Sequence, residues 1–215
     1  SSGKVEIKYM TAKEEDILTN SSFIRKGTVL DKLLESVIIS KINIDDLIVG
    51  DKNALLIATR ILGYGSQYEV EINGEKETID LSQLENKEFD ESQITQGLNE
   101  FQFTLPHTNT PITYKILTGS DEKKLEKEIE GIKRIKKDSN PSLSTRLKYI
   151  ITSVNGDTER KAINEFVDVY LLAKDSKALR DHIKETQPDV DLNVILDSGS
   201  EVRVPIGLGF FWPDA

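Results

Sequence analysis

Pairs of carboxylates are the first candidates for chemistry in this chain. Asp45 and Asp46 are adjacent, and Asp189 and Asp191 are separated by one residue. Two carboxylates that flank a substrate can act as general acid and general base. Such a site also needs a nucleophile, or an acid with a raised pKa, close to the pair. Nothing in the sequence places such a group near either pair. We therefore interpret both pairs as solvated surface groups.

The two histidines and the absence of cysteine limit metal and redox chemistry. His107 lies in a proline-flanked turn, and His182 lies on the polar side of an expected short helix. Each is interpreted as an exposed or packing side chain and not as a general base. Two widely separated histidines are too few ligands for a four-coordinate zinc site. We expect no structural metal, no cofactor and no thiol catalysis.

Two glycine pairs and one serine resemble parts of known motifs. Gly63 and Gly65, like Gly207 and Gly209, lack the residues that complete a phosphate loop or a dinucleotide fingerprint. Structural turns explain both pairs. Asp175 or Ser176 is expected to cap a helix that runs to Lys184. The sequence therefore predicts a protein that is not an enzyme.

The segment Phe210-Phe211-Trp212 is the one candidate binding site. Three consecutive aromatics cannot all face one side of a strand or helix, and they reduce solubility unless they are covered. They either fill a groove in their own chain or anchor the protein to a partner, because aromatics are enriched at interface hot spots. Phe210, Phe211 and Trp212 are the candidate partner-binding residues, and of the two alternatives we favour the internal groove.

Charge and hydropathy exclude two kinds of partner. The chain has 28 Lys and Arg against 37 Asp and Glu, a net charge of -9. A broad basic face for nucleic acid is therefore not expected. No apolar run approaches the roughly 20 residues that a membrane-spanning helix needs, so we also expect no membrane span. The composition is that of an ordinary globular protein of the cytoplasm.

Hydrophobic periodicity predicts an α+β fold. Alternation predicts strands at 4–9 and 192–196 with 202–206, a hairpin at 68–81 about Asn73-Gly74, and a hairpin at 101–116. Helical spacing predicts helices that begin at Thr11 and Thr28, and helices at 53–62 (capped by Asp51), 121–137, 143–154, 158–173 and 175–184. The helix at 53–62 is apolar almost all round, so we expect it to be the most buried of the N-terminal half.

These elements group into three regions in the predicted organisation. Residues 1–119 form an N-terminal unit of helices and two hairpins, and residues 120–140 form a charged connecting helix with a thin apolar stripe. Residues 141–215 form a helical C-terminal unit with a terminal hairpin and the aromatic tail.

Four stretches of the chain resemble a known family. They are Tyr9-Met10-Thr11-Ala12-Lys13-Glu14-Glu15, the stretch at 51–68 with the segment LLIATRILGYGSQYEV (residues 55–70), residues 171–194 and the closing VPIGLGFFWPDA at 204–215. The family is the baseplate hub subunit of T-even-type contractile-tailed phages and their myophage relatives. The resemblance covers most of the chain, and its motifs are structural.

The resemblance implies a structural subunit of the phage baseplate hub, or alternatively a tail-assembly chaperone that acts on the tape-measure protein and is absent from finished virions. It implies other tail and baseplate proteins as partners, a place in the virion after assembly in the host cytoplasm, and no enzymatic activity or cofactor. One departure concerns hairpin turns at which some family members carry cysteine pairs. The matching turns here, around Gly74 and Gly199, have none, so metal binding is not carried over.

Overall fold

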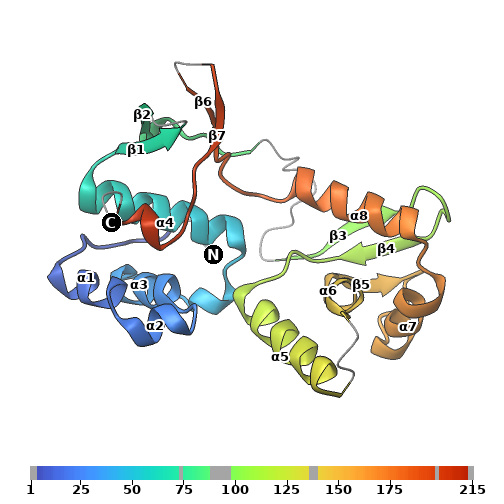
Figure 1. Cartoon of the computed structure of the whole chain (residues 1–215). Helices are drawn as coiled ribbons and strands as arrows, with labels where there is room; N and C mark the ends of the chain where they lie inside the picture. The colour runs from blue at the N-terminus through green and yellow to red at the C-terminus, as the bar shows by residue number, and fades with distance from the viewer. Residues whose placement is uncertain (1–3, 73–74, 88–97, 136–139, 197–198, 213–215) are drawn as a thin grey trace. The chain divides into compact units, whose positions relative to one another are not determined.

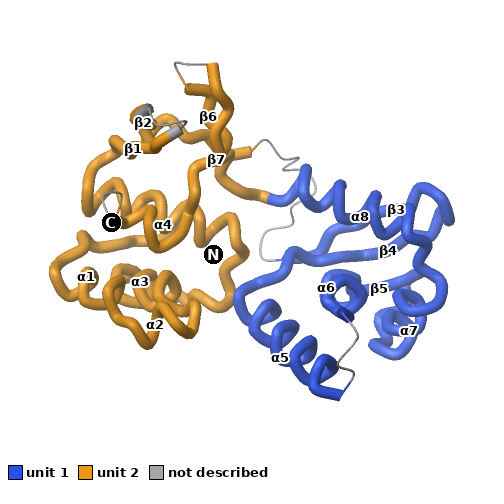
Figure 2. The backbone as a smooth tube through the Cα atoms, viewed as in Figure 1, with its two compact units in different colours: residues 1, 88–187 blue, residues 2–87, 188–215 orange. Residues whose placement is uncertain are grey.

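The computed structural model describes residues 4–72, 75–87, 98–135, 140–196 and 199–212. Helices are combined with small antiparallel sheets, so the predicted α+β class is confirmed (Figure 1). The chain divides into two compact units (Figure 2). We call residues 88–187 the inserted unit, and residues 2–87 with 188–215 the split unit, because the inserted unit interrupts it in the sequence.

This division differs from the predicted organisation with boundaries after 119 and 140. The strand at 111–114 pairs with the strand at 101–104 on one side and with a strand at 151–154 on the other, so this hairpin belongs with the following helices. The terminal hairpin and the aromatic tail pack into the core of the N-terminal elements. The charged helix is not a connector, because Leu125 is fully buried in the inserted unit's core and Ile129 packs against it. These contacts join segments that are far apart in the sequence, and local sequence patterns do not predict them.

The split unit is built from short helices and two separate two-stranded hairpins. Its elements are α1 (Ala12–Leu18), α2 (Ser21–Arg25), α3 (Val29–Val37), η1 (Ile44–Asp46), α4 (Val49–Tyr64), β1 (Gln67–Ile72), β2 (Glu75–Asp80), η2 (Leu81–Gln83), β6 (Asn193–Ile195), β7 (Glu201–Arg203) and η5 (Leu208–Phe210). The register of β1 with β2 places Tyr68 opposite Ile79, as the alternation predicts. The predicted turn at Asn73-Gly74 lies outside the described residues.

The core of the split unit is centred on α3. Leu33, Leu34 and Val37 of α3 are fully buried, and they lie on the face that the helical spacing predicts. The prediction that the helix at 53–62 would be the most buried is wrong, because among its apolar residues only Leu56 and Ile57 are fully buried.

Three N-terminal details also differ from prediction. Helix α4 begins at Val49, so Asp51 lies in its first turn and does not cap it. The expected strand at 4–9 forms only a bridge between Ile7 and Ile38. The short helix α2, at 21–25, was not predicted; Asn20 caps it by accepting hydrogen bonds from the N–H groups of Ser22 and Phe23.

The inserted unit combines helices with a three-stranded antiparallel sheet in the order β3-β4-β5. Its elements are β3 (Phe101–Thr104), β4 (Pro111–Tyr114), α5 (Gly119–Ile135), α6 (Ser142–Ile150), β5 (Ile151–Val154), α7 (Arg160–Glu165), the π-helical turn η4 (Phe166–Tyr170) and α8 (Ala173–Thr186). Helix α8 runs alongside β3 and β4 (Figure 1), and the imidazole of His182 stacks on Phe103 with ring centroids 4.4 Å apart.

Two predicted helices of the inserted unit are wrong in their second halves. The helix expected at 143–154 ends at Ile150, because Ile151-Thr152-Ser153-Val154 forms β5 against β4; β-branched residues favour such a strand. The helix expected at 158–173 becomes α7 followed by a π-helical turn, and α8 starts at Ala173, before the predicted cap at Asp175.

Candidate functional site

The aromatic segment at 210–212 lies against the core of its own unit. Phe210 and Phe211 are each only 1% exposed and belong to the hydrophobic core of the split unit, while Trp212 is partly buried against that core. Phe210 packs on Tyr68 with ring centroids 5.1 Å apart, and Phe211 meets Phe210 edge-on at 5.5 Å. Phe210 is the last residue of the short 3₁₀ turn η5, and Phe211 follows as its C-cap.

Arg60 of α4 fastens this segment. Its side chain is almost completely buried. Its Nε donates to the carbonyl oxygen of Phe210 at 3.0 Å, and its terminal nitrogens donate to the carbonyl oxygens of Gly65 at 3.0 Å and Gln67 at 3.4 Å. The planar guanidinium can satisfy three carbonyls at once because its donors form a fixed fork. One side chain therefore joins α4, the start of β1 and a segment 150 residues away.

Aromatic rings complete the surroundings of Arg60. The guanidinium carbon lies 5.1 Å from the ring centre of Tyr64 and 5.9 Å from that of Tyr68, which are cation–π distances. Burial lowers the pKa of Arg60 and raises the pKa of both tyrosine hydroxyls. An arginine remains protonated under such conditions. Among the described residues, the buried positive charge is compensated by carbonyl and ring dipoles, and no carboxylate forms an ion pair with it.

The surface edge of this cluster is formed by Trp212 and Tyr64, with ring centroids 6.4 Å apart. Of the three residues assigned to partner binding, Trp212 alone retains exposed surface, since Phe210 and Phe211 fill the core of the split unit. The internal groove, one of the two alternatives that the sequence left open, is thus where the structure places the two phenylalanines.

Comparisons with protein-family models, with curated proteins and with solved structures found no match.

Of the carboxylate pairs that the sequence singled out, Asp189 and Asp191 accept structural hydrogen bonds, and the other pair lies in a short turn. Asp189 accepts hydrogen bonds from the side-chain amide of Asn53 at 3.0 Å and from the N–H of Val190. Asp191 accepts from the N–H of Asn193, and Asp46 lies in the 3₁₀ turn η1. Among the described residues, no group of three or more histidines and carboxylates lies close enough to hold a metal ion.

The two histidines also have structural surroundings. The backbone N–H of His107 donates to a carboxylate oxygen of Asp175 at 2.8 Å. His182 packs between Phe103 and Tyr114, not on a polar face as predicted. Burial lowers the pKa of His182, although nearby Glu185 opposes the shift. The ring is therefore neutral at neutral pH and acts as a flat packing surface.

Two fully buried carboxylates were not predicted. Asp175 accepts hydrogen bonds from the N–H groups of His107 and Thr108 and from the Thr108 hydroxyl. Glu14 accepts from Lys8, from the hydroxyl of Ser36, and from the N–H and hydroxyl of Thr11. Burial raises the pKa of each carboxyl, but these donors outweigh burial and hold both pKa values below their usual range.

Replacing Glu14 with glutamine is expected to reduce the stability of the split unit and to weaken its acid sensitivity. The folded-state pKa of Glu14 is depressed well below its usual range, so its stabilisation is present above the unfolded-state pKa of about 4.3 and is lost as the pH falls. We expect a loss of about 2–3 kcal/mol at pH 7. Urea unfolding at pH 7 and pH 3 measures both effects.

The matched control is Glu35→Gln, which removes an exposed surface pair with Lys32. This control should cost less than about 1 kcal/mol. A Glu14→Gln protein whose stability and pH profile match those of the control would contradict the assignment of Glu14 as a buried, hydrogen-bonded anion.

An exposed apolar segment at 169–172 spans the end of the π-helical turn and was also not predicted. Val169 is 69% exposed, Tyr170 58% and Leu172 51%, while Leu171 between them packs against the core of the inserted unit. At regular helical spacing, Tyr170 would share a face with Phe166 and Val167. The wider π-helical turn changes the phase of the side chains, so Val167 faces the core and Val169 and Tyr170 face solvent.

The inserted unit also has a polar hollow of about 410 Å³, lined by Lys115, Lys124, Tyr149, Thr158 and Arg160 among others. Two of its cations are engaged by protein groups. Lys115 pairs with Asp121 at 2.7 Å, and Arg160 lies over the Tyr149 ring, 5.0 Å from its centre.

The predicted structural turn at Gly65, in the split unit, is confirmed, with φ of 86° at the end of α4.

Within the described residues, none of the helices is long and apolar enough to span a membrane.

Proposed function

We propose that this protein is a non-catalytic structural component of a phage tail baseplate hub that acts through protein–protein contacts. The sequence resemblance supports this role, and its segments coincide with structural features. The stretch at 51–68 supplies α4 and Arg60, and the stretch at 204–215 supplies the aromatic segment that Arg60 holds. The resembling motifs therefore include the residues that close the core of the split unit.

The exposed segment at 169–172 carries the proposal of an interaction role. Three large apolar side chains within four residues are exposed at the surface of the inserted unit. Scattered exposed apolar residues are normal, but a concentrated group of them is typical of protein-binding surfaces. Tyrosine is enriched at the energetic centres of such surfaces. Tyr170 is accordingly the residue that we propose as the centre of the contact.

The surroundings of the buried carboxylates favour a non-catalytic role. A carboxyl group that acts as a general acid near neutral pH needs a raised pKa. In Glu14 and Asp175 the pKa is lowered, because each carboxylate accepts hydrogen bonds from the loop or helix that it fastens. These two buried acids therefore act as structural anchors.

The tail-assembly chaperone is the alternative that the same resemblance leaves open. The two roles differ in where the protein ends up. A structural subunit is retained in finished particles in a fixed ratio to other baseplate proteins. A chaperone is found with the tape-measure protein in assembly intermediates and is absent from finished particles.

Quantitative mass spectrometry of gradient-purified phage particles and of assembly intermediates tests the proposal. We expect peptides of this chain in finished particles, at constant ratio to other baseplate proteins across the gradient. Presence in intermediates alone would replace the structural role with the chaperone role. Absence from both fractions would overturn the proposed function.

A double variant, Val169→Ser with Tyr170→Ser, is expected to lower incorporation into particles. Loss of an interface centre weakens binding by about 2 kcal/mol or more, roughly thirtyfold. The melting temperature of the isolated protein should stay the same, because both side chains are exposed. Ile135→Ser is the matched control, since Ile135 is also exposed and lies in the same unit. Equal incorporation of the variant and the control would contradict the role of this segment.

A further inference from the structure

Two strands of the split unit have an unpaired edge beside the same groove. Strand β2 pairs only with β1, and β6 pairs only with β7, within the part of the chain that the structure describes. Each strand therefore has one edge whose backbone groups are not used in its hairpin. Such an edge is a template for another extended strand unless it is covered or blocked.

The hydrogen-bond pattern identifies the backbone groups on the free edge of β2. The N–H of Leu81 donates to the carbonyl of Ser66, so this pair faces inward, and antiparallel pairs alternate from there. Glu77 and Ile79 accordingly bond to β1, while the N–H and C=O groups of Lys76, Thr78 and Asp80 point away from it. Thr78 lies at the middle of the free edge.

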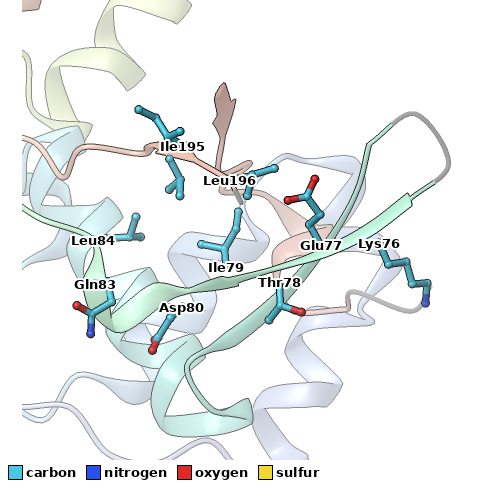
Figure 3. A pocket seen from close by; sticks show the side chains of 10 residues that line it. Lys76, Glu77, Thr78, Ile79, Asp80, Gln83, Leu84, Ile195 and Leu196 are labelled. Atoms are coloured by element: carbon cyan, nitrogen blue, oxygen red, sulfur yellow. The ribbon is translucent and has the colours of Figure 1, made fainter. Parts of the chain in front are cut away.

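An open groove of about 640 Å³ runs along this edge. It is lined by consecutive residues of both strands, as expected where a groove follows strand edges: Lys76, Glu77, Thr78, Ile79, Asp80, Gln83, Leu84, Val194, Ile195 and Leu196. Ile79, Leu84 and Leu196 approach one another across it, while Lys76, Thr78 and Asp80 point to the other side of β2 (Figure 3). Ile195 on β6 is 78% exposed.

The charge beside the groove is strongly negative. Residues 67–80 contain one lysine, Lys76, against the acidic residues Glu69, Glu71, Glu75, Glu77 and Asp80. The ammonium group of Lys76 lies 3.5 Å from the carboxylate of Glu69, so its charge is partly compensated within the hairpin. A second copy of this chain that paired edge to edge would bring the same acids together, and like charges on facing strands are destabilising.

We propose that the free edge of β2 binds an extended, basic segment of a partner protein by strand addition. Backbone hydrogen bonds to Lys76, Thr78 and Asp80 hold the segment, as in other β-augmentation sites. Alternate apolar side chains of the segment contact Ile195, which lines the groove and is 78% exposed, and lysines or arginines between them face the acidic hairpin. The inference deepens the proposed interaction role by naming a surface and the chemistry of its partner.

Thr78→Pro is the decisive variant. Proline removes the outward N–H of residue 78, and it is tolerated at an edge position because that N–H takes no part in pairing with β1. Thr78→Val is the matched control, since it keeps the N–H and the strand preference. The circular dichroism spectrum and melting temperature of the two variants verify that the hairpin persists in each.

The probe is an octapeptide of alternating lysine and valine, titrated into the full chain with amide shifts followed by NMR. We expect saturable shifts confined to residues 76–80 and 194–196, with Kd below about 1 mM. Thr78→Pro should raise Kd at least about tenfold, and Thr78→Val should leave it unchanged. An octapeptide of alternating glutamate and valine should not bind.

Three results would overturn the proposal: no saturable shift, equal binding of the acidic peptide, or equal binding by Thr78→Pro. Shifts of the same residues on raising protein concentration without peptide would indicate a second copy as the occupant, and would equally overturn it. The peptide titration uses the isolated protein, so its failure leaves the particle mass spectrometry unaffected and distinguishes this inference from the proposed function.

Discussion

Replacing Phe210 or Phe211 by alanine is expected to destabilise the split unit by about 3–5 kcal/mol each, the usual cost of removing a buried phenylalanine. Both rings are fully buried, and they contact each other and Tyr68. A loss of this size is a large part of the stability of a typical domain. Urea unfolding followed by the fluorescence of Trp212, the one tryptophan of the chain, measures the effect at the segment itself.

Tyr9→Ala serves as the control, because it removes an exposed aromatic from the same unit. Surface changes of this kind alter stability by less than about 0.5 kcal/mol. Phenylalanine variants that unfold like the control would mean that the segment is not part of the core in solution. Unchanged stability with lost incorporation into particles would support the partner-anchor alternative instead.

Arg60→Met is expected to cost about 3–5 kcal/mol. Methionine fills part of the volume but leaves the carbonyl oxygens of Phe210, Gly65 and Gln67 without the donor that the guanidinium provides. Each buried polar group left unsatisfied costs about 1–3 kcal/mol. Arg60→Lys keeps the charge but not the fork of donors, so its cost should be intermediate. Urea unfolding at neutral pH again measures the loss.

Arg134→Met is the matched control, since Arg134 is exposed and forms a surface pair with Glu130. Its expected cost is below about 1 kcal/mol. Coupling gives a second measurement: the double variant Arg60→Met, Phe210→Ala should cost less than the sum of the single variants, because both changes release the same segment. Strict additivity would contradict a direct link between Arg60 and the aromatic segment.

The parts of the fold that sequence predicted are those with a strong local pattern. Helix α3 has apolar residues at helical spacing, and the β1–β2 hairpin alternates on both strands. Strand β5 was missed because Ile150 and Ile151 continue the helical spacing of α6 across the boundary. The π-helical turn was missed because a local widening of the helix leaves no periodic signal in so short a segment.

The candidate site was predicted in part, for a related reason. Three adjacent aromatics indicate a covered segment without showing what covers it. Arg60 lies 150 residues from Phe210, so nothing local links them. Glu14 looked like an ordinary acid in the first turn of a helix, and only tertiary packing with Ser36 and Lys8 buries it. Tyr170 is exposed because of the π-helical turn η4, which the helical periodicity did not predict.

The split of one unit around the other determines the order in which the chain can fold during synthesis. Residues 88–187 leave the ribosome as one continuous stretch, and domains generally fold as units as they emerge. The core formed by α3 and α4 must wait, because Phe210 and Phe211 are translated long after its other members. A nascent chain arrested before residue 208 therefore presents an open apolar core, which chaperones and proteases can recognise.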